Sequence, residues 1–258
     1  MSKQPVPRLL MLTLALVGGA RSALAQDPSP PDPGLLASGL LRGWERELDL
    51  GVNGSNGNSE SLSVHAGFKA GYKDSADVWK LDSAYDTAST DGDTSRNQFF
   101  ADLRKEWLWA DSPWFGFAQG RYDWDELKDW DFRIALSAGA GYQFIEGPSW
   151  DLAGRFGLGG SRTYGGLDDG FVPEAVLGLD AGWTISARES VQFATTFYPS
   201  LEDGGEFRNI TTLDWKMQMG EEKRLSMKIG LSDEYDSQAA QGIEQNDFKY
   251  YFALVWNP

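Results

Sequence analysis

Apolar and polar residues alternate one by one along much of the chain from residue 44 onward. The clearest segment runs from Trp130 to Phe144, where every second side chain is apolar and the intervening residues are polar or small. Successive side chains of a β-strand point to opposite faces of the sheet, so this period of two predicts strands with one apolar face. Twelve such strands are expected, beginning near residues 44, 61, 77, 96, 114, 130, 150, 172, 190, 207, 224 and 247.

The connections between these strands alternate between short turns and mostly longer loops. The short turns are expected at residues 73–76, 110–113, 146–149, 186–189 and 220–223. The loops rich in Gly, Asp and Ser are expected at residues 54–60, 89–95, 125–129, 162–171, 200–206 and 236–246. This arrangement is typical of an all-β, closed antiparallel up-and-down transmembrane β-barrel with about 12 strands and periplasmic termini.

Tryptophan residues gather at the strand ends on the short-turn side. An indole ring combines a large apolar surface with one N–H donor, and it therefore favours the boundary between lipid tails and headgroups. Eight of the 11 tryptophans are placed there: Trp44, Trp79, Trp107, Trp109, Trp114, Trp150, Trp183 and Trp256. A second aromatic belt is expected near the longer loops, from Tyr85, Tyr122, Trp124, Trp130, Tyr198 and Tyr235.

The first 25 residues have the order of a secretory signal peptide. A basic start with Lys3 and Arg8 precedes the apolar stretch Leu9 to Val17, and Ala23-Leu24-Ala25 supplies a cleavage site of small residues. We therefore expect three parts: residues 1–25 as signal peptide, 26–43 as a Pro-rich periplasmic linker, and 44–258 as the barrel in the cell outer membrane.

Charge and cysteine content exclude several classes of function. The formal charge of −15 becomes about −18 once Lys3, Arg8 and Arg21 leave with the signal peptide, so nucleic acid is not an expected partner. The sequence has no cysteine, which excludes disulfides, thiolate metal sites and cysteine catalysis.

The less apolar face of the predicted strands carries most of the charged residues. They are Lys80, Asp82, Asp102, Arg104, Arg121, Arg133, Arg155, Asp180, Arg208, Asp214, Lys216, Lys228 and Lys249. Lys105 lies instead on the apolar face, close to Trp107 and Trp109, where its ammonium group is expected to reach the membrane boundary. Because soluble barrels and sandwiches alternate in the same way, a secreted lipocalin-like binding protein stays open as an alternative.

The last predicted strand, Phe248 to Trp256, ends almost at the C-terminus in an aromatic residue. It resembles the signal that the barrel-insertion machinery reads, and in a closed barrel it is expected to pair with Glu45 to Val52. The expected partners are therefore outer-membrane lipid and lipopolysaccharide, that insertion machinery, and small cations.

Several stretches together resemble a named family, the salt-induced outer-membrane proteins, which form a domain of unknown function. The matching stretches are Trp44 to Gly51 with Gly57 to Ser61, Asp131-Phe132-Arg133 with Gly139 to Tyr142, Tyr198 to Leu201, and Tyr235-Asp236 with Gly242 and Asp247. The resemblance implies a barrel located in the outer membrane, and it brings no agreed activity and no functional residues with it. A structural barrel of this kind is expected to have a role in envelope or osmotic stress.

His65 is the single histidine and the one place where catalysis is to be sought. Counting across the expected turns places it opposite Ala84 and Asp49, with Asp82 and Asp86 on the diagonals. A barrel hydrolase that pairs His65 with a neighbouring Asp is therefore an alternative function, although the preferred interpretation is a histidine within a charge network and no enzyme. The acidic clusters Asp91-Gly92-Asp93, Asp168-Asp169-Gly170 and Glu202-Asp203 match no complete coordination loop, so we expect no metal site and no cofactor.

Two functions of a barrel remain: a passive channel and a structural barrel whose interior charges form a plug. Twelve strands make a barrel wider than the eight-stranded kind that side chains fill. The long loops are acidic and hold Lys128 and Arg162 as their only bases. Any passage is therefore expected to prefer cations, and the sequence names no solute.

Overall fold

The computed structural model describes residues 43–55, 60–166, 169–222, 224–238 and 244–258. The expected signal peptide, and the expected linker up to residue 42, lie outside these residues. Twelve strands follow, each beginning within three residues of its expected position. They are β1 (Glu45–Ser55), β2 (Ser61–Lys73), β3 (Asp77–Thr90), β4 (Asp93–Leu108), β5 (Trp114–Asp125), β6 (Phe132–Glu146), β7 (Trp150–Tyr164), β8 (Phe171–Thr184), β9 (Glu189–Pro199), β10 (Phe207–Met219), β11 (Leu225–Asp236) and β12 (Asn246–Trp256).

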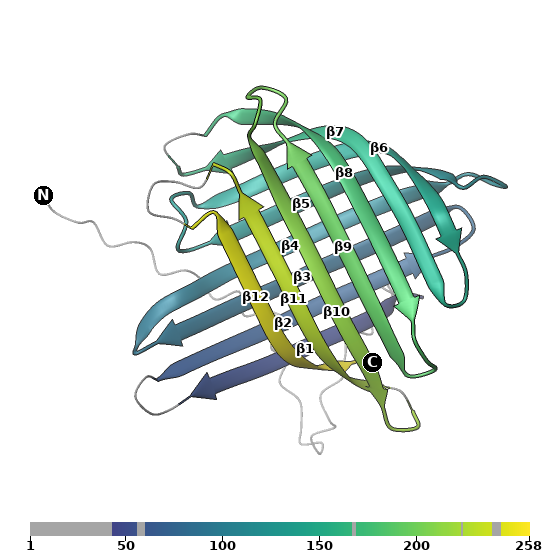
Figure 1. Ribbon diagram of the computed structural model, residues 1–258, viewed down its shortest axis with the longest axis horizontal. Helices are drawn as coiled ribbons and strands as arrows, with labels where there is room; N and C mark the ends of the chain where they lie inside the picture. The colour runs from purple at the N-terminus through teal and green to yellow at the C-terminus, as the bar shows by residue number, and fades with distance from the viewer. Residues whose placement is uncertain (1–42, 56–59, 167–168, 223, 239–243) are drawn as a thin grey trace, which may run out of the picture. The chain divides into compact units, whose positions relative to one another are not determined.

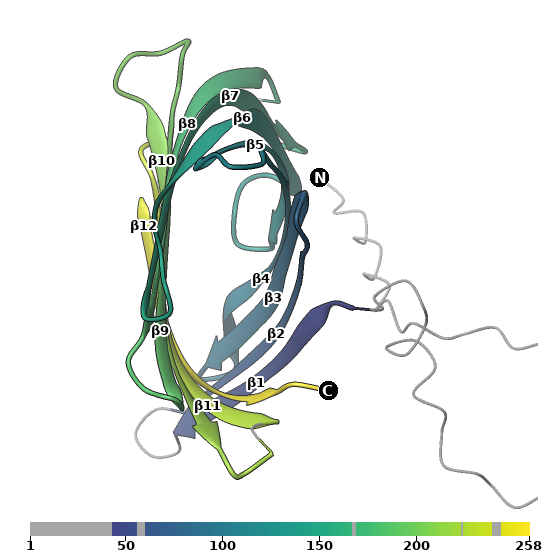
Figure 2. The ribbon, with the colours of Figure 1, turned by 90° about the vertical axis from the view of Figure 1, so that its right-hand side faces the viewer.

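The strands form one closed antiparallel barrel in which each strand pairs with its neighbours along the chain. Figure 1 shows the tilted strands of the front and back walls crossing, and Figure 2 shows the two walls joined into a ring of strands. The seam between β1 and β12 closes the barrel through Leu48↔Trp256, Asp49↔Val255 and Leu50↔Leu254. The expected pairing of the last strand with the first is therefore confirmed.

Turn chemistry sets the register of the hairpins. In the β2–β3 turn the Asp74 Oδ1 accepts hydrogen bonds of 2.8 Å from the N–H groups of Ala76 and Asp77. Asp91 and Gly92 join β3 to β4 with φ angles of 53° and 90°, values suited to a two-residue hairpin turn. The loop expected at residues 89–95 was therefore wrong, because the Asp-Gly pair lets the two strands continue to Thr90 and Asp93.

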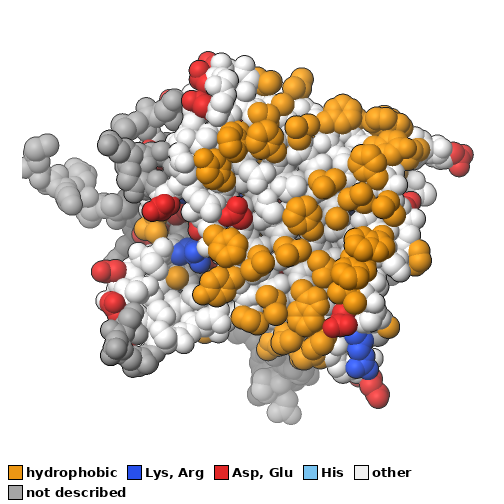
Figure 3. Space-filling model, viewed as in Figure 1, with side chains coloured by type: hydrophobic (Ala, Val, Ile, Leu, Met, Phe, Trp, Pro, Cys, Tyr) orange, Lys and Arg blue, Asp and Glu red, His pale blue; other side chains and the backbone are white. Residues whose placement is uncertain are grey.

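The outer wall of the barrel is apolar, as Figure 3 shows for the face seen in Figure 1. Leu, Ile, Phe and Trp side chains from most strands remain exposed there, among them Leu136, Leu158 and Phe252. Trp150 and Trp183 stack on neighbouring strands with ring centroids 5.1 Å apart, at the end with the short turns. This agrees with the expected aromatic belt.

Lys105 lies in the outer wall, as its position in the pattern predicted. Its Nζ is 4.8 Å from the ring centroid of Trp79 and 5.2 Å from that of Trp107. It also forms an ion pair of 3.3 Å with Asp77 at the end of the strand. The ammonium group thus reaches a polar partner while its stem covers indole rings.

Two aromatic residues do not belong to the expected second belt. Tyr198 lies on the inner row of β9 and is buried, with the Arg208 guanidinium 4.7 Å from its ring centroid. Trp130 precedes β6 and has the Arg133 guanidinium 5.1 Å from its ring. Both aromatic rings contact arginines that face the lumen. The alternation of apolar and polar residues does not predict such contacts.

Apolar residues fill part of the interior. Phe115 and Phe117 on β5, Val176 on β8 and Val255 on β12 are almost completely buried and belong to inner rows. Gly141 makes room for the Phe115 ring, since a Cβ added there would lie 2.2 Å from a ring carbon. The barrel is therefore packed in places rather than uniformly hollow.

Candidate functional site: the charged lumen

The inner rows of the strands form a lumen lined by ionisable side chains. The pairings Lys80↔Arg104, Asp82↔Asp102 and Asp102↔Arg121 place charged residues of β3, β4 and β5 side by side on one face. The register places all thirteen charged residues expected on the less apolar face in inner rows. The sequence pattern thus identified the lumen, but not which charges meet.

Several ion pairs join opposite walls of the barrel. Arg104 of β4 donates from Nη2 to Asp180 Oδ2 of β8 at 2.8 Å, and Asp180 also pairs with Arg155 of β7. Glu106 lies 2.9 Å from Arg104 Nε. These side chains are largely buried, so this half of the lumen is filled by a compact charge network. Such contacts could not be predicted because they depend on which walls face each other.

A second network lies at the end of the long loops. Arg208 of β10 contacts Glu174 of β8 at 3.5 Å and Asp123 of β5 at 4.0 Å. Arg133 of β6 reaches Asp236 of β11 at 3.0 Å across the lumen. A cavity of about 300 Å³ opens beside these residues.

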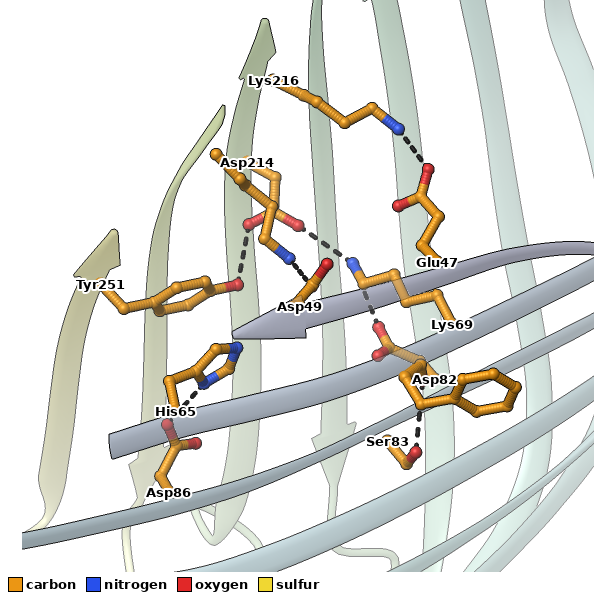
Figure 4. A network of polar contacts seen from close by, with 12 residues as sticks. Glu47, Asp49, His65, Lys69, Asp82, Ser83, Asp86, Asp214, Lys216 and Tyr251 are labelled. Carbon is orange, nitrogen blue, oxygen red and sulfur yellow. Dashed lines mark hydrogen bonds and ion pairs between the residues drawn. The ribbon is translucent and has the colours of Figure 1, made fainter. Parts of the chain in front are cut away.

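The other half of the lumen is more accessible to solvent. Lys69 of β2 bridges Asp82 of β3 at 3.4 Å and Asp214 of β10 at 3.0 Å, as Figure 4 shows. The side chains of Lys69 and Asp82 keep 36% and 42% of their exposure although both face inward. Lys80 keeps 50% in its pair with Glu106. Water therefore reaches the interior along the β2–β3 wall.

Next to this wall lies a fully buried pair, Lys228 of β11 and Asp49 of β1, whose side chains keep 3% and 1% of their exposure. Lys216 and Glu47 form a further pair between β10 and β1. Tyr251 of β12 donates from its hydroxyl to Asp214 at 3.0 Å. Figure 4 shows Glu47, Asp49, Asp214, Lys216 and Tyr251, which come from strands on both sides of the β1–β12 seam.

His65 lies on the inner face, but its neighbours differ from those expected. It pairs across the ladder with Gly51 and Asp86, not with Asp49 and Ala84. The expected register was wrong by two residues at each hairpin, because the β2–β3 turn closes at Lys73↔Val78 and the first at Ser55↔Ser61.

The contacts of His65 are those of an ion-pair partner. Its Nδ1 lies 2.6 Å from Asp86 Oδ1, and its ring stacks on Tyr251 with centroids 4.0 Å apart. The hydrolase alternative pairs His65 with a neighbouring Asp, and Asp86 is that neighbour in the structure. The same contact also makes the imidazole part of the charge network of the lumen, which is the interpretation preferred from the sequence.

The acidic loop clusters provide no metal site within the described residues. Asp91, Asp93, Glu202 and Asp203 are exposed, and the described part of the chain brings together no group of three or more His, Asp or Glu side chains suited to hold a metal ion. Asp168 lies outside the described residues.

Comparisons with known proteins agree with this architecture. The model of a protein family of unknown function, DUF481, matches residues 48–257. No curated protein matches. Among the described residues, no helix is long and apolar enough to cross a membrane.

Solved structures of outer-membrane barrels are similar in fold. The NanC porin is 11% identical with a TM-score of 0.50, over 82% of this chain and 99% of that one. An outer-membrane channel from Pseudomonas putida F1 is 8% identical with a TM-score of 0.46, over 83% of this chain and 94% of that one. At such identities the similarity extends to the fold alone.

Proposed function

The chain belongs to the protein family of unknown function DUF481, and on its barrel we propose that it is an outer-membrane protein that passes small cations through a narrow, charge-lined lumen. The proposal includes periplasmic termini, export by residues 1–25, and insertion through recognition of Phe248 to Trp256. It also includes contact of the outer wall with lipid and lipopolysaccharide.

The apolar outer wall supports a membrane location. Soluble monomers rarely expose contiguous apolar patches larger than a few hundred Å². Here exposed Leu, Phe and Trp side chains follow one another over neighbouring strands, with an indole belt at the short-turn end. A water-soluble lipocalin-like binder would need a polar outer surface instead, so this alternative is not favoured.

The main observation in support of an ion passage is the solvent-accessible inner wall formed by β2 and β3, called the wet wall below. Lys69, Asp82 and Lys80 face the lumen and yet keep between a third and a half of their side-chain exposure. The three lie on neighbouring strands, and Lys80 is two residues from Asp82 toward the short-turn end. A small ion moving along this wall meets charged side chains instead of apolar ones, which lowers the cost of leaving bulk water.

The cation preference rests on the long-loop end. Glu126, Glu202 and Asp203 are exposed carboxylates in these loops, and Asp91 and Asp93 are exposed at the tight β3–β4 hairpin of the same end. Clustered charges of one sign raise the local concentration of counter-ions, and the effect weakens as salt screens it. The mouth therefore attracts cations before they reach the lumen.

Planar-bilayer recording of the refolded full chain tests the proposal. We expect a small conductance with K⁺ preferred over Cl⁻. Lys69→Met removes a lumen cation about 7 Å from a passing ion, which lowers the energy of K⁺ and raises that of Cl⁻ by roughly 0.6 kcal/mol each in water-like surroundings, so the K⁺/Cl⁻ ratio should rise about sevenfold. Lys105→Met removes the same charge from the outer wall and serves as the matched control, with an unchanged ratio expected. Absence of conductance, or anion preference, would overturn the proposal.

The cross-lumen ion pairs favour one second candidate, a structural barrel with a plugged interior. Arg104–Asp180 and Arg133–Asp236 tie opposite walls together, as a plug would. This candidate predicts no conductance, and an envelope that leaks under osmotic stress when the gene is deleted. Unchanged osmotic tolerance of the deletion strain would count against it.

A further inference from the structure

His65 is buried between two carboxylates, next to the solvent-accessible wall of β2 and β3. Its Nδ1 edge meets Asp86 at 2.6 Å. Its Nε2 edge faces Gly67, where an added Cβ would lie 3.4 Å from Nε2 and 3.1 Å from Asp49 Oδ2. The missing side chain of Gly67 thus leaves the imidazole and the second carboxylate on either side of one small gap. One oxygen of that carboxylate, Asp49 Oδ1, is buried without a hydrogen-bond partner.

A cavity of about 50 Å³ lies against this arrangement, with room for one or two water molecules. Its ionisable lining comes from β1, β2, β3, β10, β11 and β12, and Tyr251 contributes a phenol that hydrogen-bonds Asp214. The four carboxylates are Asp49, Asp82, Asp86 and Asp214, and the three ammonium groups are Lys69, Lys228 and Lys249.

The charge of this cavity therefore depends on His65. Four carboxylates against three ammonium groups leave one negative charge while the imidazole is neutral, and none when it is an imidazolium. Histidine is the side chain whose charge ordinarily changes between pH 5 and pH 8. Lys69 and Asp82 belong both to this cavity and to the wet wall, so a passing ion experiences the change directly.

We infer that His65 is the specificity-determining residue of the lumen: neutral His65 leaves a net negative cavity that favours cations, and protonated His65 cancels that preference. The inference rests on the proposed cation passage and adds a pH-dependent selectivity to it. The stacked Tyr251 ring holds the plane of the imidazole.

The test measures the K⁺/Cl⁻ permeability ratio from reversal potentials across a KCl gradient, with the full chain in planar bilayers at pH 8 and pH 5. We expect the ratio of the unmodified protein to fall about sevenfold at pH 5, because one added positive charge near the path disfavours K⁺ and favours Cl⁻ at the same time. His65→Gln keeps a donor for Asp86 but does not titrate. This variant should hold the pH 8 ratio at both pH values.

Asp203→Asn is the matched control, because it removes an exposed carboxylate from the β9–β10 loop that does not line the His65 cavity. It should lower the ratio at both pH values and keep the pH-dependent fall. Heat-modifiable migration of each variant in gel electrophoresis verifies that the barrel has formed. A fall that persists in His65→Gln, or no fall in the unmodified protein, overturns the inference while the passage stands. Absence of conductance at both pH values overturns the passage itself.

Discussion

Removal of Lys228 from its buried pair with Asp49 should destabilise the barrel strongly. Lys228 is only 2% exposed and Asp49 only 1%, and the Tyr251 ring lies 5.2 Å from the ammonium group. Lys228→Met leaves the Asp49 carboxylate without its counter-charge in the interior. Breaking a buried pair in this way costs about 3–5 kcal/mol, or roughly a hundred- to several-thousand-fold in the folding equilibrium.

A solvent-exposed pair of the same chemistry provides the control. Lys73 and Glu146 approach to 3.1 Å while keeping 63% and 69% of their side-chain exposure. Such pairs contribute at most about 1 kcal/mol, so Lys73→Met should change stability little. The assay is equilibrium urea unfolding in lipid vesicles followed by tryptophan fluorescence. Equal losses in the two variants would refute the conclusion that the interior charges near the β1–β12 seam are shielded from water.

Three further predictions concern packing, protonation and the seam. Gly141→Val should cost about 1–3 kcal/mol in the same assay because its side chain collides with Phe115, whereas Ala140→Val on the lipid side should be nearly neutral. The backbone N–H groups of Ala76 and Asp77 lower the pKa of Asp74, so its contribution to stability is complete above about pH 4 and is lost as the pH falls through the lowered pKa. A carboxyl NMR titration with a midpoint at or above the ordinary value would contradict this. Backbone amides at the β1–β12 seam should exchange hydrogen faster than those between β1 and β2. The reason is that β1 forms three residue pairs with β12 and eleven with β2. Equal exchange rates at the two places would contradict this prediction.

The strands and the orientation of most side chains could be predicted from the sequence because the period of two is a local property. Lys105 is an informative example: its place on the apolar face, beside indole rings, followed from alternation alone. The tight hairpin at Asp91-Gly92 could also have been predicted, since both residues tolerate positive φ. The polar residues on either side of this pair led instead to the prediction of a longer loop.

The contacts within the lumen could not be predicted in the same way. The register at His65 depended on whether Lys73 pairs with Ala76 or with Val78, and this shift of two residues moved the partner of His65 from Ala84 to Asp86. Pairs such as Lys69–Asp214 join strands that are far apart in the sequence, and their meeting depends on strand number, tilt and barrel flattening. Tyr198 carried a local warning, because it alternates in phase with the polar residues Gln192 and Thr196 of its own strand.

Chemical labelling of single-cysteine variants tests most directly which face of the barrel contacts water and which face contacts lipid. The absence of native cysteine makes single-cysteine variants unambiguous. In proteoliposomes, Asp82→Cys on the wet inner wall should react with a charged maleimide, while Leu136→Cys on the outer wall should not. A fluorophore attached at residue 136 in detergent and then reconstituted should be quenched by brominated lipid tails. Rapid aqueous labelling at residue 136 without lipid quenching would contradict a barrel whose apolar side faces the membrane.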